Sequence, residues 1–211
     1  MHATRIIRDS TCCSRAQTTA KLPRKHAAPS TLPRVRIVYY GESPMHTNVP
    51  MISDARGLRI AIATSRYHHE ITQALLVGAR QAFVAAGGEE DALVLVEAPG
   101  SFELITIAHA LAGRTDLDAV VCLGCILEGE TTHDKYLCEA VANGFAAITA
   151  ASGKPIAFGI LTCQTVEQAV ARAGGGGSKA KGNKGKEAMD AAIISAQAVR
   201  TIATLPLGRP A

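Results

Sequence analysis

Residues 119–133, Ala-Val-Val-Cys-Leu-Gly-Cys-Ile-Leu-Glu-Gly-Glu-Thr-Thr-His, lead from an apolar run into a polar loop. The run Ala119–Leu123 is apolar at every position, which is typical of a parallel strand with both faces covered. Gly124 is expected to end this strand, and Gly129 allows a further turn in the loop. Because ligands of α/β proteins collect beyond the carboxyl ends of such strands, we expect a functional site here.

His133 stands at the end of this loop. If the next helix starts there, the backbone N–H groups of Glu130, Thr131 and Thr132 are placed to line an anion pocket. An imidazole is suited to proton transfer because it gains and loses a proton near neutral pH. The alternative is that His133 is a surface residue near a helix start, without a chemical role.

Strand-like apolar runs alternate with helical patterns from residue 58 onward. The expected strands are Leu58–Thr64, Ala92–Ala98, Ala119–Gly124 and Pro155–Leu161. The expected helices are His69–Ala86, Phe102–Ala112, Asp134–Ala151, Glu167–Ala173 and Glu187–Ala203. This order and the right-handed crossover rule predict an α/β fold, a three-layer α/β/α sandwich with a central four-stranded parallel sheet of flavodoxin-like architecture.

Two phosphate-binding motifs are absent from the sequence. The Gly-rich, basic segment Gly174–Gly185 contains no G-x-x-x-x-G-K-[ST] match, so a flexible solvated loop is expected there. The first strand is followed by Thr64-Ser-Arg-Tyr67 rather than by G-x-G-x-x-G, which argues against a dinucleotide site.

The cysteines do not form a metal-binding pattern. Cys122 and Cys125 resemble a C-x-x-C, but no second Cys/His pair follows at zinc-ligand spacing. We therefore expect no metal site. Cys138 and Cys163 also lie in apolar or helical contexts, so all four are expected to act as small hydrophobic residues in a reducing compartment.

The positive charge of the chain is concentrated near its start. Residues 1–50 contain eight Lys/Arg and two acidic residues, whereas the remaining residues contain 14 basic and 16 acidic ones. The globular part is therefore not expected to bind nucleic acid. The first 50 residues also have no apolar run long enough for a membrane span. Three explanations stay open: an organelle transit peptide, non-native sequence upstream of Met45 or Met51, or a disordered tail.

Several motifs in chain order resemble those of the lumazine synthase family. They are Ser65-Arg-Tyr67, Pro99-Gly-Ser-Phe-Glu103, Gly129-Glu-Thr-Thr-His133, Phe158-Gly-Ile-Leu-Thr162, Glu167-Gln-Ala-Val-Ala-Arg172 and Gly182-Asn-Lys-Gly185. The resemblance implies a domain over residues 57–204, with a basic, disordered extension over residues 1–56 and a tail over residues 205–211. It also implies condensation of 5-amino-6-(D-ribitylamino)uracil with 3,4-dihydroxy-2-butanone 4-phosphate, without a cofactor.

The resemblance further implies roles for individual residues. His133 is expected to transfer protons, Arg172 to bind the phosphate with help from Lys184, and Tyr67 to stack on the pyrimidine. The remaining substrate-binding residues are expected to be Ser101, Phe102, Glu103, Ile126, Leu127, Glu130, Thr131 and Phe158. Phe102 and Phe158 are also suited to a hydrophobic core, and Arg172 to a surface ion pair with Glu167.

The resemblance also implies an assembly. Members of the family form pentamers, some of which build a sixty-subunit icosahedral shell, and Phe158 would then close the pocket of a neighbouring subunit. Riboflavin synthase is an expected partner, and the cytoplasm is the expected location, with a plastid as the alternative. Rival hypotheses are a flavin- or nucleotide-binding module, a scaffold without turnover, and an enzyme for a different carbonyl phosphate.

Overall fold

The computed structural model describes residues 49 and 51–205. Most of the extension predicted over residues 1–56, and the tail after Leu205, lie outside these residues. Within the described part of that extension, Ala55 is fully buried and its N–H donates to the carbonyl of Ala86 at 2.9 Å. The packed structure therefore already includes Ala55.

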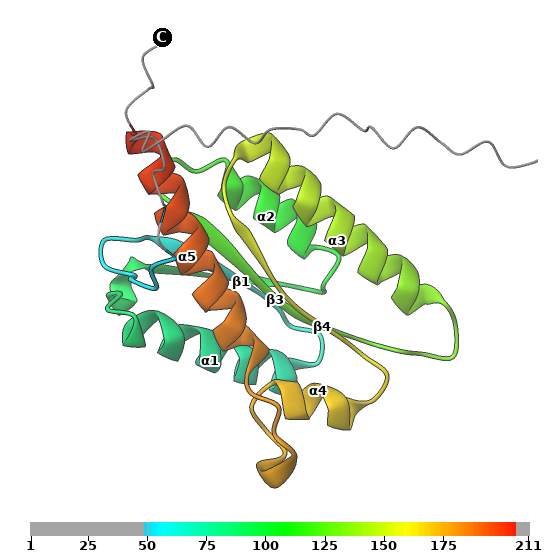
Figure 1. Cartoon of the computed structure of the whole chain (residues 1–211). Coiled ribbons are helices and arrows are strands. Elements are labelled where there is room, and N and C mark those ends of the chain that lie inside the picture. Colours follow the sequence, from blue (N-terminus) through cyan, green and yellow to red (C-terminus); the bar gives the residue numbers. More distant parts are fainter. Residues whose placement is uncertain (1–48, 50, 206–211) are drawn as a thin grey trace, which may run out of the picture. The chain divides into compact units, whose positions relative to one another are not determined.

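A parallel sheet forms the centre of the fold, in the order β2-β1-β3-β4 (Figure 1). Its strands are β1 (Ile60–Ser65), β2 (Leu93–Ala98), β3 (Ala119–Leu127) and β4 (Ile156–Cys163). The two central strands are buried at nearly every position because helices cover both of their faces. The predicted four-stranded parallel sheet is confirmed.

Helices cover the two faces of the sheet and make the three-layer sandwich that the sequence predicted (Figure 1). They are α1 (His69–Ala85), α2 (Leu104–Ala112), α3 (His133–Ser152), α4 (Val166–Arg172) and α5 (Lys184–Thr204). One hydrophobic core lies under α1 and α5 and includes Phe83 and Met189. The other lies under α2 and α3 and includes Leu104 and Phe145.

The third strand is longer than predicted. It was expected to end at Gly124, but β3 continues to Leu127 and pairs with β4 as far as Cys163. A glycine is needed at position 124 because an added Cβ would lie 2.6 Å from Ser101 Oγ. The glycine therefore makes room for a neighbouring side chain and does not turn the backbone.

The last helix also begins earlier than predicted, at Lys184 instead of Glu187. Asn183 caps it, because its side-chain oxygen accepts from the N–H groups of Gly185 at 2.9 Å and Lys186 at 3.1 Å. The preceding segment was expected to be a flexible loop. It is held by a bridge between Ala173 and Asn183 and contains a short 3-10 helix, Gly177–Lys179.

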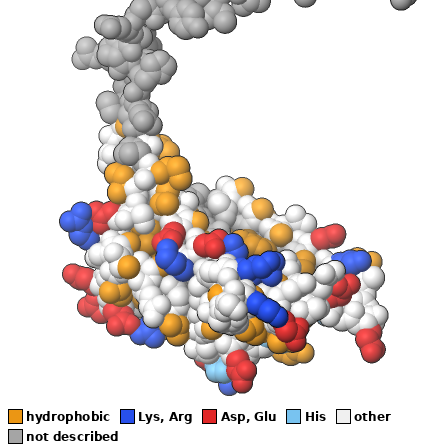
Figure 2. Space-filling view, turned by 60° about the horizontal axis from the view of Figure 1, so that its bottom comes forward, with side chains coloured by type: hydrophobic (Ala, Val, Ile, Leu, Met, Phe, Trp, Pro, Cys, Tyr) orange, Lys and Arg blue, Asp and Glu red, His pale blue; other side chains and the backbone are white. Residues whose placement is uncertain are grey.

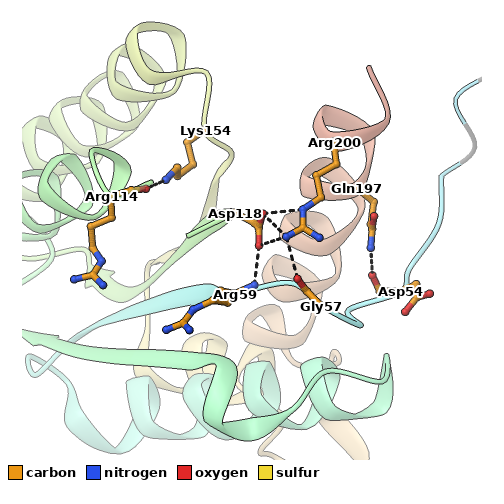
Figure 3. Close-up of polar contacts among 8 residues, drawn as sticks. All are labelled: Asp54, Gly57, Arg59, Arg114, Asp118, Lys154, Gln197 and Arg200. Atoms are coloured by element: carbon orange, nitrogen blue, oxygen red, sulfur yellow. Dashed lines mark hydrogen bonds and ion pairs between the residues drawn. The ribbon is translucent and has the colours of Figure 1, made fainter. Parts of the chain in front are cut away.

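Asp118 joins three segments at the amino ends of the strands (Figure 3). Its carboxylate accepts from the Arg59 N–H at 2.7 Å and from two nitrogens of Arg200, each at 2.8 Å. Arg200 also donates to the Gly57 carbonyl at 2.9 Å, and Gln197 donates to the Asp54 carbonyl at 2.6 Å. These bonds fasten the end of α5 to the residues that lead into β1.

Candidate active site

Several of the predicted site residues follow the carboxyl ends of three neighbouring strands. Tyr67 comes two residues after β1, Ser101–Glu103 follow β2, and Thr131 and His133 follow β3. Since these strands are parallel, their carboxyl ends meet at one edge of the sheet. Ligands of open α/β sheets bind beyond this edge.

A cavity of about 510 Å³ lies between these loops. It is lined by Tyr67, His68, Gly100, Ser101, Phe102, Glu103, Cys125, Ile126, Leu127, Gly129, Thr131, His133, Asp134 and Leu137. Eight of the residues predicted from the sequence are therefore brought together. Glu130 is not part of the lining, but it lies between Gly129 and Thr131, which are.

His133 is the first residue of α3, and its side chain is exposed. Its backbone N–H faces the Thr131 hydroxyl at 3.4 Å, while the N-cap residue Thr132 makes no side-chain cap hydrogen bond. The first N–H groups of a helix have no partner within the helix, and the helix dipole favours an anion there. An imidazole and a helix start, where an anion is favoured, are thus adjacent at this cavity.

Two aromatic rings border the cavity and are unusually exposed. The exposed fractions of Tyr67 and Phe102 are 67% and 51%. The alternative that Phe102 is a core residue is therefore wrong. Exposed aromatic surface beside a cavity is suited to stacking on a heteroaromatic ligand.

Two polar atoms near the cavity lack partners. Ser101 Oγ and Asp134 Oδ1 are buried, and neither has a hydrogen-bond partner in the part of the chain that the structure describes. Most buried polar atoms are hydrogen-bonded, so such exceptions call for an explanation. Polar groups of a bound substrate would supply partners here.

The other predicted residues do not reach this cavity. Phe158, Arg172 and Lys184 line a separate cavity of about 330 Å³ between β4, α4 and α5. Phe158 lies on the edge strand with 46% of its surface exposed, so it is not a fully buried core residue either. One chain therefore holds the predicted site in two parts.

Arg172 does not form the surface ion pair with Glu167 that the sequence left open as an alternative. Arg172 donates to the Gln168 carbonyl at 3.0 Å, and its guanidinium has no carboxylate partner among the described residues. Lys184 instead pairs with Glu187 at 2.6 Å. Arg172 thus remains able to make charge-assisted bonds to an anion.

The four described cysteines are free thiols. Cys122, Cys125 and Cys163 are buried, as expected, whereas Cys138 is half-buried. Burial raises the pKa of the Cys122 thiol to about 12, and burial together with Cys163 raises that of Cys125 to about 12. Within residues 49 and 51–205, no group of three or more His, Cys, Asp or Glu side chains is arranged to hold a metal.

Six lining residues were not among the predicted site residues: His68, Gly100, Cys125, Gly129, Asp134 and Leu137. Gly100 and Gly129 lie within the motifs quoted from the sequence, and Asp134 follows His133 directly. Cys125 and Leu137 have no local signal, because their positions depend on the length of β3 and the start of α3.

The surface that comes forward in Figure 2 carries acidic and basic side chains interspersed with hydrophobic ones. None of the described helices is both long and apolar enough to cross a membrane.

Together, the parallel sheet and the cavity at its carboxyl edge define an α/β enzyme that acts on small molecules. A sequence model of the 6,7-dimethyl-8-ribityllumazine synthase family matches residues 57–200. The chain belongs to this family. It is an enzyme of riboflavin biosynthesis, and its reaction is the lumazine synthase reaction.

Curated relatives agree with this assignment. The 6,7-dimethyl-8-ribityllumazine synthase of Thermus thermophilus is 45% identical over 142 residues, which cover 67% of this chain and 88% of the relative. That of Kineococcus radiotolerans is 43% identical over 155 residues, covering 74% and 93%. That of Aquifex aeolicus is 39% identical over 148 residues, covering 70% and 94%.

Proposed function

We propose that the chain performs its reaction in the cavity at the carboxyl edge of the sheet, with His133 as the proton-transfer residue. The reaction joins ribitylaminouracil to dihydroxybutanone phosphate and releases phosphate and water. An imine must form, phosphate must leave, and a ring must close, so protons move at every stage. The observation that supports this site is the position of His133 in the cavity, at the start of a long helix.

The pyrimidine is proposed to stack on the exposed ring of Tyr67, with Phe102 nearby. Glu103 would accept hydrogen bonds from ribityl hydroxyls, and the buried Ser101 hydroxyl would gain its missing partner from the same substrate. Ile126 and Leu127, at the end of β3, would present main-chain groups to the uracil edge. These contacts fix the amino group before the second substrate arrives.

The phosphate of the second substrate is proposed to bind between Arg172 and the start of α3. Arg172 provides a planar guanidinium for bidentate bonds, and the N–H groups near Glu130 and Thr131 provide further donors. Lys184 adds positive charge, although its ion pair with Glu187 must open or rotate to reach the anion.

These two sets of residues are proposed to meet across a subunit interface. Phe158, Arg172 and Lys184 lie around their own cavity, so a second copy must bring its set to the His133 cavity of the first. Such a head-to-tail contact repeats around a ring, which fits the homopentamer expected for the family. Assembly into an icosahedral shell, and association with riboflavin synthase, are further steps of the same proposal.

An intersubunit complementation experiment tests this arrangement. The His133→Ala and Arg172→Ala variants are each expected to have little or no activity alone. The two proteins are denatured, mixed in equal amounts and refolded together. Random mixing in a ring leaves about one interface in four with both native residues, so activity should reappear in the mixture. A mixture no more active than its two components would mean that both residues serve the same chain's site.

The cellular location of the chain is the remaining part of the proposal. The four free thiols among the described residues fit a reducing compartment, and the cytoplasm is therefore the proposed location. A plastid is the alternative if residues 1–50 act as a transit peptide. Imaging of the full chain with a fluorescent fusion at its carboxyl end distinguishes the two.

A further inference from the structure

His68 has an unusual backbone conformation at the mouth of the cavity. Its φ and ψ angles are 56° and 49°, in the left-handed region, and it is the only non-glycine residue with positive φ in the described part of the chain. This region is uncommon for a residue with a side chain, although Asn, Asp and His adopt it more often than the others do. Such outliers persist where the surroundings hold them, often at functional sites.

Local structure does not account for a histidine at this position. His68 is the N-cap of α1, but its side chain makes no cap hydrogen bond. Its carbonyl accepts from the N–H groups of Ile71 at 2.9 Å and Thr72 at 3.1 Å, contacts that any residue makes with its backbone. Glycine would adopt the same backbone without strain. The backbone alone therefore gives no reason for an imidazole at this position.

The imidazole lies against the ring proposed to stack on the pyrimidine. The Tyr67 and His68 ring centroids are 4.7 Å apart with an interplanar angle of 76°, an edge-to-face pair. His68 is half-buried and lines the catalytic cavity together with His133. On its other side it lines an apolar cavity of about 420 Å³ that Val166 and Val170 also border. Its ring therefore forms part of the wall behind Tyr67.

We propose that His68 is a positioning residue, whose left-handed backbone places its imidazole against Tyr67 and thereby fixes the face on which the pyrimidine stacks. This inference rests on the proposed stacking role of Tyr67. Tyr67 itself is 67% exposed, so few other groups hold its ring. Removing the imidazole should weaken binding of the pyrimidine substrate and leave the phosphate substrate unaffected.

Three variants of His68 separate the ring from the backbone strain. His68→Gly removes both, His68→Asn removes the ring in a residue that tolerates the left-handed region, and His68→Phe retains an aromatic ring. His69→Asn is the matched control, because His69 is exposed and does not line the catalytic cavity. For each oligomeric enzyme, the KM of both substrates, kcat and the thermal midpoint are measured.

We expect His68→Gly and His68→Asn to raise the KM of ribitylaminouracil roughly two- to tenfold, the range that an aromatic pair is worth. The thermal midpoint of His68→Gly should stay close to that of the wild type, because the relieved strain is opposed by the lost ring contact and by the greater freedom of glycine in the unfolded chain. His68→Phe should keep a KM near that of the wild type. The KM of the butanone phosphate should not change in any of them.

The inference is overturned if His68→Gly and His68→Asn leave the KM of ribitylaminouracil unchanged, or raise both KM values equally. Tyr67→Ala separates this failure from a failure of the proposed function. If Tyr67→Ala raises the KM of the pyrimidine substrate and the His68 variants do not, only the role of His68 is wrong. If Tyr67→Ala has no effect either, the stacking role fails and the inference fails with it.

Discussion

Arg172 ends a seven-residue helix with its guanidinium on a backbone carbonyl and without a carboxylate partner among the described residues. We expect Arg172→Ala to raise the KM of the butanone phosphate about tenfold or more, since a charge-assisted bidentate contact is lost. Arg172→Lys should recover only part of the affinity for the butanone phosphate, because an ammonium cannot bind two phosphate oxygens in the same plane. Steady-state kinetics with each substrate varied in turn measure both values. Arg80→Ala, which removes a surface arginine paired with Glu90, is the control.

His133→Ala should lower kcat by about 10²-fold or more, because general acid–base catalysis contributes in that range. Its fold should be unaffected, since His133 is exposed and its side chain packs in neither core. Steady-state assays of product formation measure kcat, and circular dichroism checks the fold. A variant with kcat near that of the wild type would assign the proton transfer to another group.

Cys122 makes stability depend on alkaline pH. Burial raises the pKa of its thiol to about 12 from the ordinary 9.0, because a thiolate in the core would lose its hydration. Below pH 9 the thiol keeps its proton in both the folded and the unfolded chain, so its contribution to stability is fully present. Between pH 9 and 12 the unfolded chain loses the proton that the folded chain retains, so the free energy of unfolding falls.

The expected loss from this thiol is about 2 kcal/mol at pH 10.5 relative to pH 8. Urea unfolding under reducing conditions at the two pH values measures it. Cys122→Ala is less stable at both pH values but should lose less on going to pH 10.5. Equal losses in the two proteins would contradict the raised pKa.

Among the elements, α1, α4 and α5 converge on the side chain of Asn183. Its oxygen caps α5, and its nitrogen donates to the carbonyls of Ala74 at 2.9 Å and Ala173 at 2.8 Å. Gly78 on α1 makes the approach possible, because an added Cβ there would lie 2.3 Å from the Asn183 side chain. One amide therefore satisfies backbone groups of three helices.

Asn183→Ala should lower the free energy of unfolding by about 2–4 kcal/mol, through the lost cap and two carbonyls left without donors. Thr165→Ala is the matched control, because Thr165 caps α4 with a single bond to the Gln168 N–H at 3.3 Å. That variant should lose only about 1 kcal/mol. Chemical denaturation measures both losses, and similar values for the two variants would show that the extra bonds of Asn183 contribute little.

Element order and type were predictable from the sequence because apolar runs and helical spacing are local signals. The end of β3 was not, since Gly124 was interpreted as a turn, although pairing with β4 carries the strand to Leu127. The ordered segment before α5 was missed for a similar reason. Its bridge to Ala173 and the cap of Asn183 depend on contacts between elements, which composition does not indicate.

At the scale of the whole molecule, the sequence predicted residues at or beyond the ends of the strands, and eight of the predicted site residues line one cavity. The separate position of Phe158, Arg172 and Lys184 was not predictable from periodicity, because it depends on which sheet edge β4 occupies. His68 gave no signal either, since Tyr67-His-His contains no glycine to mark a left-handed residue.

The proposed assembly has a measurable mass. With a chain of 22.0 kDa, a pentamer has about 110 kDa and a sixty-subunit shell about 1,300 kDa. Native mass spectrometry or light scattering distinguishes them. Activity per chain should fall on dilution as subunits separate, whereas a dilute monomer with full activity would contradict the shared site.

The bonds of Arg200 to Gly57 and of Gln197 to Asp54 also bear on protein engineering. They bring the end of α5 beside the residues that precede β1 (Figure 3). This contact lies near the amino ends of the strands, whereas the His133 cavity lies at their carboxyl ends. A short linker from residue 205 to residue 54 could therefore close the chain, and new termini could be opened in the exposed glycines 176–177. The described domain is thus suited to circular permutation, and the loops that line the His133 cavity stay uncut.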